Sequence, residues 1–168
     1  MKNLVVTDRE ISTHYFQNSV IANLNNIHYS TCTGGLTCLK CEGACHFKDD
    51  MSIISNWTND CQLIIYITKV KYGCFDIPFK KMLERLVVNH EPYYTMVDGE
   101  TCHLGLSQLR KKLLVIGYGE ASEDEKKLFK DILDDSTLGF SYSSVDAYFC
   151  EENELDEVLR TFGGVDHG

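Results

Sequence analysis

The stretch CQLIIYITKVKYGCFDIPFKKMLERL, residues Cys61 to Leu86, decides the fold. It begins with a nearly unbroken apolar run from Leu63 to Ile67, which is typical of a strand covered on both faces in a parallel sheet. Its second half carries one apolar stripe of a helix, made by Phe75, Phe79, Met82, Leu83 and Leu86. Asp76 can cap that helix. The stretch therefore predicts a buried strand followed by a helix.

The segment between this strand and this helix, Thr68 to Cys74, is polar and irregular, so we expect it to be a loop. In open α/β sheets, ligands bind in the crevice at the carboxyl ends of the strands, where such a loop lies. Gly73 has no side chain that would block a ligand there. The loop is therefore the predicted position of the functional site.

The N-terminal part of the chain predicts a strand, a helix and a weaker second strand. Asn3 to Thr7 has the composition of a short strand. After Ser12, apolar residues recur at every fourth position (Phe16, Val20, Leu24), which predicts a helix that ends near Asn25 and Asn26. Ile27 to Ser30 is the expected second strand.

The remaining chain continues the alternation of strands and helices. A cysteine-rich loop precedes a helix that begins at Asp49, and an irregular excursion covers residues 90–110, with a turn at Asp98-Gly99. The further elements are a strand at Leu113–Ile116, a helix from Ser122, a strand at Val145–Cys150 and a helix at Leu155–Phe162. This order predicts one doubly wound α/β domain that comprises residues 1–168.

Composition and charge narrow the classes of function. The chain has 25 acidic and 16 basic side chains and a net charge of −9, which argues against sequence-independent binding of DNA or RNA. No apolar run reaches the ~20 residues that a membrane span needs, and the N-terminus does not resemble a signal peptide. We therefore expect a cytoplasmic protein, without nucleic-acid or membrane partners, whose eight cysteines are mostly reduced.

Four segments, in this order, resemble the NAD(P)H-dependent FMN reductases and iron–sulfur flavoproteins. These segments are Cys45 to Met51, Thr68 to Gly73 with the helix that follows, Asp98 to Thr101 with His103, and Lys112 to Leu133. The resemblance implies a flavodoxin-like fold, with a parallel five-stranded sheet in the order 2-1-3-4-5. It also implies FMN across the loops after strands 1, 3 and 4.

The same resemblance implies which residues bind FMN. Thr68, Val70, Tyr72 and Gly73 would flank the isoalloxazine ring, together with Tyr118 and Gly119. The simpler alternative is that these glycines only make turns.

Two loops depart from the family's pattern. The first loop, Asp8 to Thr13, has no glycine and carries two carboxylates, although Arg9, Ser12 and Thr13 are candidates to bind the phosphate. In the later loop, Lys69 and Lys71 replace residues that the family prefers. A lysine beside the ring would stabilise the anionic reduced flavin, while solvated loop lysines are the alternative.

Four cysteines (Cys32, Cys38, Cys41 and Cys45) are spaced C-x5-C-x2-C-x3-C, which leaves three interpretations open. They bind a metal or an iron–sulfur cluster, form a redox-active or disulfide pair, or have no chemical role. Gly35 stands where the iron–sulfur relatives have their second cysteine, so we predict neither a cluster nor a metal site. Cys74 is the best single candidate for a reactive thiol, although packing in the core is the favoured alternative for it. Cys61 and Cys150 are expected to be buried hydrophobic residues.

The leading hypothesis is an FMN-binding oxidoreductase that takes hydride from NAD(P)H, with no side chain as a catalytic acid or base. Its expected partners are flavin, nicotinamide and a second copy of the chain in a homodimer. The first alternative is a flavodoxin-like scaffold that has lost flavin and serves as a binding or regulatory module. A further alternative is a small redox protein that carries a metal or a cluster on the cysteine-rich loop.

Overall fold

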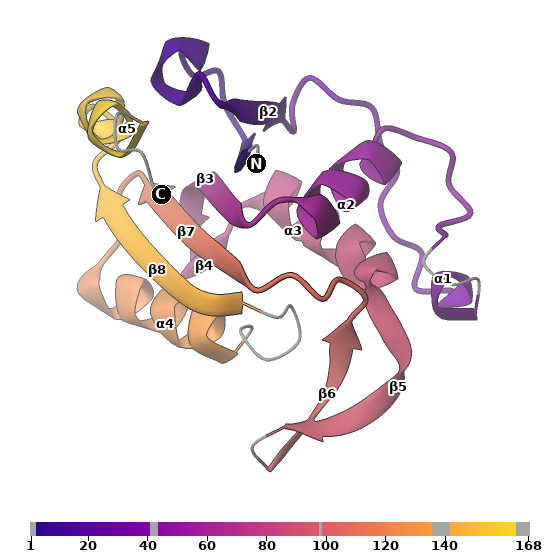
Figure 1. Cartoon of the computed structure of the whole chain (residues 1–168). Helices are drawn as coiled ribbons and strands as arrows, with labels where there is room; N and C mark the ends of the chain where they lie inside the picture. The colour runs from indigo at the N-terminus through magenta and orange to yellow at the C-terminus, as the bar shows by residue number, and fades with distance from the viewer. Residues whose placement is uncertain (1–2, 41–43, 98, 136–141, 164–168) are drawn as a thin grey trace.

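A parallel sheet forms the centre of the molecule (Figure 1). The computed structural model describes residues 3–40, 44–97, 99–135 and 142–163. The parallel strands are β1 (Asn3–Thr7), β2 (Ser19–Asn23), β3 (Leu63–Lys71), β7 (Lys111–Tyr118) and β8 (Tyr142–Cys150). Their spatial order is β2-β1-β3-β7-β8. This is the predicted order 2-1-3-4-5, so the fold prediction is confirmed.

Strand β3 is central because both of its faces are apolar. It pairs in parallel with β1 on one side and with β7 on the other, with Tyr66 opposite Val6 and Val115. Ile64 and Ile65 point to opposite faces of the sheet, and both are buried. The prediction from the apolar run Leu63 to Ile67 is therefore confirmed.

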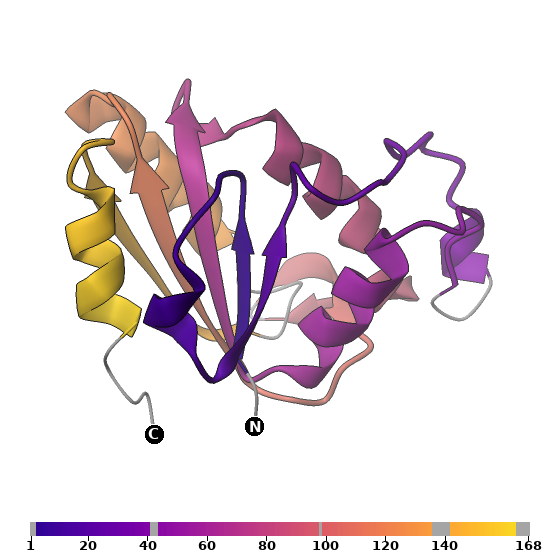
Figure 2. The ribbon, with the colours of Figure 1, turned by 90° about the horizontal axis from the view of Figure 1, so that it is seen from above.

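Helices cover both faces of the sheet (Figure 2). One face packs against α2 (Met51–Asp60), α3 (Ile77–Arg85) and α4 (Glu123–Asp135). The other face packs against α5 (Leu155–Gly163) and the short 3-10 helix η1 (Thr13–Phe16). Asp76 caps α3 as predicted, since its carboxylate accepts a hydrogen bond from the backbone N–H of Ile77 at 2.7 Å. No helix in the described ranges has the length and apolar character that crossing a bilayer requires.

The predicted first helix is wrong. Only η1 is helical, and Val20 and Ala22 lie in β2, which pairs with β1 along its whole length. Residues four positions apart lie on the same face of a helix, and they also lie on the same face of a strand because four is a multiple of the strand's two-residue period. Ala22 and Leu24 point into the core on that two-residue period. The strand expected at Ile27–Ser30 is also wrong, because these residues form a loop.

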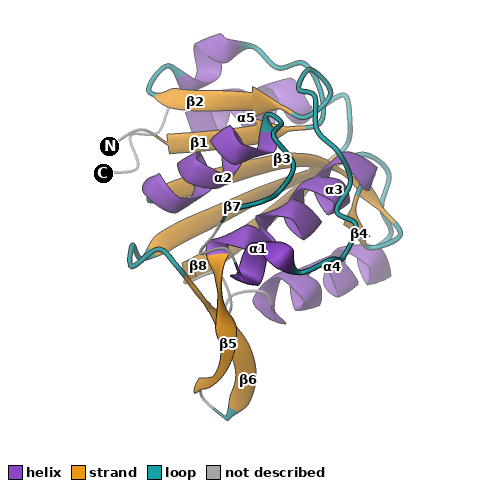
Figure 3. Ribbon diagram, turned by 90° about the vertical axis from the view of Figure 1, so that its right-hand side faces the viewer, coloured by secondary structure: helices purple, strands orange, loops and turns teal. Residues whose placement is uncertain are grey.

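The excursion at residues 90–110 contains an antiparallel hairpin that projects from the body (Figures 1 and 3). Its strands are β5 (His90–Val97) and β6 (Glu100–Gly105), and we call residues 90–105 the arm. Gly99 has a positive φ of 89°, while Asp98, the other residue of the predicted turn, lies outside the described residues. The arm follows η2 (Leu86–Asn89), a 3-10 helix that extends α3.

A buried ion pair attaches the cysteine-rich loop to α3. Both terminal nitrogens of Arg85 donate to the carboxylate of Asp49 at 2.9 Å, and one of them also donates to the carbonyl of Ser30 at 2.7 Å. The two side chains are almost completely buried. The guanidinium lowers the pKa of Asp49 to about 2. This pair holds the loop, which contains the short α1 (Thr37–Lys40), beside the sheet's helical layer.

Asp49→Asn tests this attachment. Removing one partner leaves the buried Arg85 charge uncompensated, so we expect a loss of about 3–5 kcal/mol in the free energy of unfolding. In the unmodified protein, this stabilisation is complete above the usual Asp pKa of 3.8 and is lost as the pH falls toward 2. Urea unfolding at neutral pH measures the change. Glu123→Gln, which alters an exposed ion pair on α4, is the control and should leave the midpoint unchanged.

Candidate functional site

Asp8 directly follows β1 and connects the ends of three strands. Its buried carboxylate accepts hydrogen bonds from the Tyr118 hydroxyl at 2.7 Å, the Thr68 hydroxyl at 3.1 Å and the Lys69 backbone N–H at 2.8 Å. Tyr118 is the last residue of β7, and Thr68 and Lys69 lie in the last part of β3. The carboxyl ends of β1, β3 and β7 are therefore fixed relative to one another by a single side chain.

Burial changes the acidity of both ends of this network. It raises the pKa of Asp8 above the usual 3.8, against the opposing effect of the three donors. Burial and the hydrogen bond to Asp8 together raise the pKa of Tyr118 well above its usual value, so the phenol stays protonated. The hydroxyl of Tyr118 is thus a permanent donor to Asp8.

Two cations stand beside this network, on its solvent side. Arg9 and Lys69 each contact the carboxylate of Glu152, which follows β8, at 3.4 Å and through different oxygens. Arg9 also lies over the Tyr118 ring, 5.1 Å from its centroid. All three ionic side chains are at least one-third exposed. The arrangement brings two positive charges to one anionic position at the carboxyl edge of the sheet.

The structure gathers five of the predicted site residues in this region: Arg9, Thr68, Lys69, Tyr118 and Gly119. Gly119 has a positive φ of 101°, and a Cβ there would have only the Lys69 side chain near it, at 3.6 Å. Backbone of this kind can approach a flat ligand closely.

The segment expected as a loop after β3 is instead mostly strand. Thr68 to Lys71 belong to β3, and the chain then turns at Tyr72-Gly73 and returns as β4 (Cys74–Phe75). Thr68 and Val70 are buried, so the expectation that this segment is too polar for the core is wrong. Both turn residues have positive φ values, as a two-residue hairpin turn requires.

The rest of this hairpin makes its described contacts with α3, α4 and Asp76. Tyr72 is exposed at the tip, and the Lys71 ammonium lies 3.9 Å from the carboxylate of Asp76. Val70 packs in the core with α3 and α4. Gly73 touches α4, because a Cβ at Gly73 would lie 2.8 Å from the Leu128 Cδ2 and 3.2 Å from the Glu125 carbonyl oxygen. Its lack of a side chain is therefore required by the packing of α4.

Ser12 and Thr13 lie apart, at the start of η1. Ser12 occupies the N-cap position without a side-chain capping hydrogen bond, and η1 has only four residues. Thr13 lines a hollow of about 490 Å³ against β2. The long helix predicted after Ser12 is thus replaced by a single turn, with Ser12 and Thr13, two candidates for phosphate binding, at its start.

Sequence reasoning missed the carboxylates that organise this region. In the sequence, Asp8 and Glu10 stand out only as carboxylates that depart from the family's first loop, yet Glu10 accepts hydrogen bonds from the side-chain amides of Asn23 and Asn26 at 3.1 and 2.6 Å. The available signal was the position of Asp8, immediately after a buried strand. Glu152 follows the last strand in the same manner. A polar residue at such a position lies at the ligand-binding edge of a parallel sheet.

The cysteine-rich loop lies on a different side of the molecule from this network. Cys32, Cys38 and Cys45 are free thiols, and Cys41 lies outside the described residues. Among the described residues, no three His, Cys, Asp or Glu side chains are grouped to bind a metal. Cys61 and Cys150 are buried, as predicted, and burial raises the pKa of Cys150 to about 11.

Comparison with known proteins identifies the fold. No family model and no curated protein sequence matches the chain. Solved structures do match. The Streptococcus mutans protein Smu.1420 superposes with a TM-score of 0.67 at 11% identity, over 97% of each chain.

Two further matches are named for redox activities. An NAD(P)H:quinone oxidoreductase from Methanothermobacter marburgensis has a TM-score of 0.64 at 11% identity, over 97% of this chain and 95% of its own. An FMN-dependent NADH-azoreductase from Bacillus anthracis, in complex with FMN, has a TM-score of 0.59 at 9% identity, over 97% of this chain and 96% of its own. At these identities the likeness shows the fold alone, and that fold is flavodoxin-like.

Gly73→Val tests the packing of the β3–β4 turn against α4. A side chain at this positive φ is strained by roughly 1–2 kcal/mol, and valine also overlaps Leu128 and the backbone of Glu125. We expect a loss of at least about 2 kcal/mol in the free energy of unfolding, measured by urea unfolding. Gly99→Val, at a positive φ with open space around it, carries the strain without the overlap and should cost less. Equal losses for the two variants would contradict the contact with α4.

Asp8→Asn tests the raised pKa of the buried carboxylate. The folded protein binds the Asp8 proton more tightly than the unfolded chain does, so Asp8 lowers stability as the pH rises from about 3.8 through the raised pKa. Asparagine has no such proton. The thermal midpoint of Asp8→Asn minus that of the unmodified protein should therefore be more positive at pH 7 than at pH 4. A difference that is constant with pH would show that Asp8 keeps its usual pKa.

Proposed function

We propose that the protein is an FMN-binding oxidoreductase that uses NAD(P)H as electron donor. The observation that carries the proposal is the pair of cations at the carboxyl ends of β1 and β3, Arg9 and Lys69, which converge on Glu152 in a flavodoxin-like sheet. The printed names of the structural matches, an FMN-dependent NADH-azoreductase and an NAD(P)H:quinone oxidoreductase, support the same class.

The residues present fit the charge of FMN. Arg9 would bind the phosphate, because its guanidinium is partly exposed in the loop after β1. The guanidinium already contacts one anion, the carboxylate of Glu152, and arginine binds phosphates in the same manner as carboxylates. Lys69 would lie beside the ring, with Gly119 allowing close approach of the backbone. A bound flavin supplies the acceptance of hydride and the passage of electrons to a second substrate.

The protein's own contribution under this proposal is electrostatic. The Lys69 ammonium favours negative charge next to it and so favours the reduced, anionic state of a flavin. Asp8 fixes the Lys69 backbone and the Tyr118 ring, which keeps the two cations in position. The exposed residues Ser12, Thr13, Lys71 and Tyr72 remain candidates for peripheral contacts, whereas Val70 and Gly73 pack in the core and against α4.

The proposal also includes the cellular setting and the assembly. We place the activity in the cytoplasm, because the described cysteines are free thiols. The proposed partners are the flavin, the nicotinamide and a second copy of the chain.

A second candidate function is a flavodoxin-like scaffold that binds no flavin. Two observations favour it. The Lys69 backbone N–H, a donor that would otherwise face a ligand, is taken by Asp8. The helix N-terminus that would hold a phosphate is reduced to the four-residue η1. Under this alternative, Asp8 and Glu152 occupy the positions of the ligand's negative groups and complete a rigid sheet edge.

Titration of FMN, followed by quenching of its fluorescence, decides between the two functions. We expect the unmodified protein to quench FMN at micromolar concentrations. Lys69→Gln and Arg9→Ala each remove a charge-assisted contact worth roughly 1.5–3 kcal/mol, so each should weaken binding about ten- to a hundredfold. Lys126→Gln, which removes an exposed ammonium on α4, is the control and should bind FMN normally. If the unmodified protein leaves the fluorescence unchanged, the flavin proposal fails and the scaffold function replaces it.

A further inference from the structure

The arm exposes large apolar side chains far from the sheet. Tyr93 is 78% exposed, and Tyr94 and Met96 are each 71% exposed. Leu104 on β6 and Leu106 just beyond it are also exposed. Figure 3 shows the arm extending away from the helices and the sheet.

Both faces of the arm are apolar. Tyr93 and Tyr94 are consecutive residues of a strand, and their side chains therefore point to opposite faces. Tyr94 stacks on His103 across the two strands, with ring centroids 4.1 Å apart, so the arm has an ordered cross-strand pair. A two-stranded hairpin alone is at best marginally stable in water. An arm of this composition is stabilised when another surface covers it.

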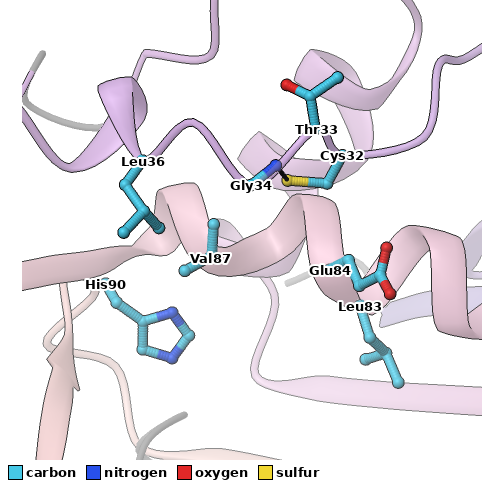
Figure 4. Close-up of a pocket in the computed structure, with 8 residues that line it drawn as sticks. All are labelled: Cys32, Thr33, Gly34, Leu36, Leu83, Glu84, Val87 and His90. Carbon is cyan, nitrogen blue, oxygen red and sulfur yellow. Dashed lines mark hydrogen bonds between the residues drawn. The ribbon is translucent and has the colours of Figure 1, made fainter.

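An apolar groove lies at the base of the arm (Figure 4). Its volume is about 630 Å³, and its walls are the loop of Cys32 to Leu36 on one side and the α3–η2 segment on the other. Leu36, Leu83 and Val87 supply its apolar lining, and Leu36 is 55% exposed. His90 both lines the groove and begins β5. Groove and arm are therefore neighbours on one side of the molecule.

The uncharged runs of the arm allow a second copy of this chain as the partner. The chain carries a net charge of −9, and two copies repel each other over most of their surfaces. Residues 92–97 and 101–105 of the arm contain no Asp, Glu, Lys or Arg, and its three acidic residues, Glu91, Asp98 and Glu100, flank these two runs in the sequence. Two copies can therefore meet along these two runs with less repulsion than over the rest of their surfaces.

We propose that the arm of one copy lies in the groove of a second copy, and the reverse, in a twofold-symmetric homodimer. A protrusion and a groove that are neighbours on one chain satisfy each other reciprocally about a twofold axis. Buried aromatic side chains contribute roughly 150–250 Å² each. Two tyrosines, Met96, two leucines and the partner's groove together approach the area of about 800 Å² per partner in a standard interface.

This inference specifies the surface for the homodimer in the proposed function, and it does not depend on flavin binding. The mass of the full chain in solution, measured by size-exclusion chromatography with light scattering, tests it. At about 100 μM, a complex of micromolar affinity is mostly dimer, so the unmodified protein should have twice the chain mass. The arm variant Tyr93→Glu with Met96→Glu and the groove variant Leu36→Glu should each raise the dissociation constant at least about thirtyfold. Both variants should then be mainly monomeric at a protein concentration near the dissociation constant of the unmodified dimer.

Ile77→Glu is the matched control. Ile77 is 65% exposed in the first turn of α3, at the end of that helix away from the arm, so its variant should remain dimeric. Circular dichroism and the thermal midpoint establish that each variant is folded. A monomeric unmodified protein, or folded arm variants that remain dimeric, would overturn the inference. A dimer that Leu36→Glu leaves intact would refute the docking of the arm in the groove. FMN titration of the same samples reports separately on the flavin proposal.

Discussion

One buried carboxylate organises the functional edge of this protein. Asp8 accepts hydrogen bonds from β3 and β7 while belonging to the chain that leaves β1, so it joins the three central strands where their backbone pairing ends. A buried carboxylate is costly unless donors surround it, and three donors do so here. The positions of Arg9, Lys69 and Tyr118 depend on this arrangement, because each is bonded to Asp8 or is its neighbour in sequence or space.

The central part of the fold could be predicted from the sequence. The run at Leu63–Ile67 is short, apolar and rich in β-branched isoleucine, which indicates a buried strand, and it lies in β3. The spacing of Phe79, Met82 and Leu83 fits the helical period, and these residues lie in α3, whereas Phe75, assigned to the same stripe, lies in β4. The region of Val20 to Leu24 fits the periods of both a helix and a strand. Hydrogen bonding to β1, a contact between distant residues, decided that region in favour of a strand. No pattern within residues 20–24 indicates that this segment pairs with β1.

The candidate site could likewise be predicted only where a local pattern or motif indicates it. The resemblance to the FMN reductases pointed to Tyr118, Gly119 and the position of Lys69, all of which lie near the carboxyl ends of β3 and β7. The role of Asp8 depends on donors that are 60, 61 and 110 residues away, so only the folded chain reveals it. The position of the turn at Tyr72-Gly73 could not be predicted either. Thr68 to Lys71 extend β3, although three of these four side chains are polar and therefore resemble a loop in the sequence.

Under the proposed function, an anionic ligand that binds at this edge must displace the carboxylate of Glu152 from Arg9 and Lys69. The Glu152 carboxylate is tethered to the end of β8, and a tethered group acts at an effective concentration of the order of millimolar or more. A free monocarboxylate only takes the place of the Glu152 carboxylate, so it cannot displace Glu152 when its own concentration is below that effective concentration. A dianion with a further point of attachment gains both a second charge and a second contact. Under the proposed function, the carboxylate of Glu152 therefore sets a minimum charge and size for a molecule that binds between Arg9 and Lys69.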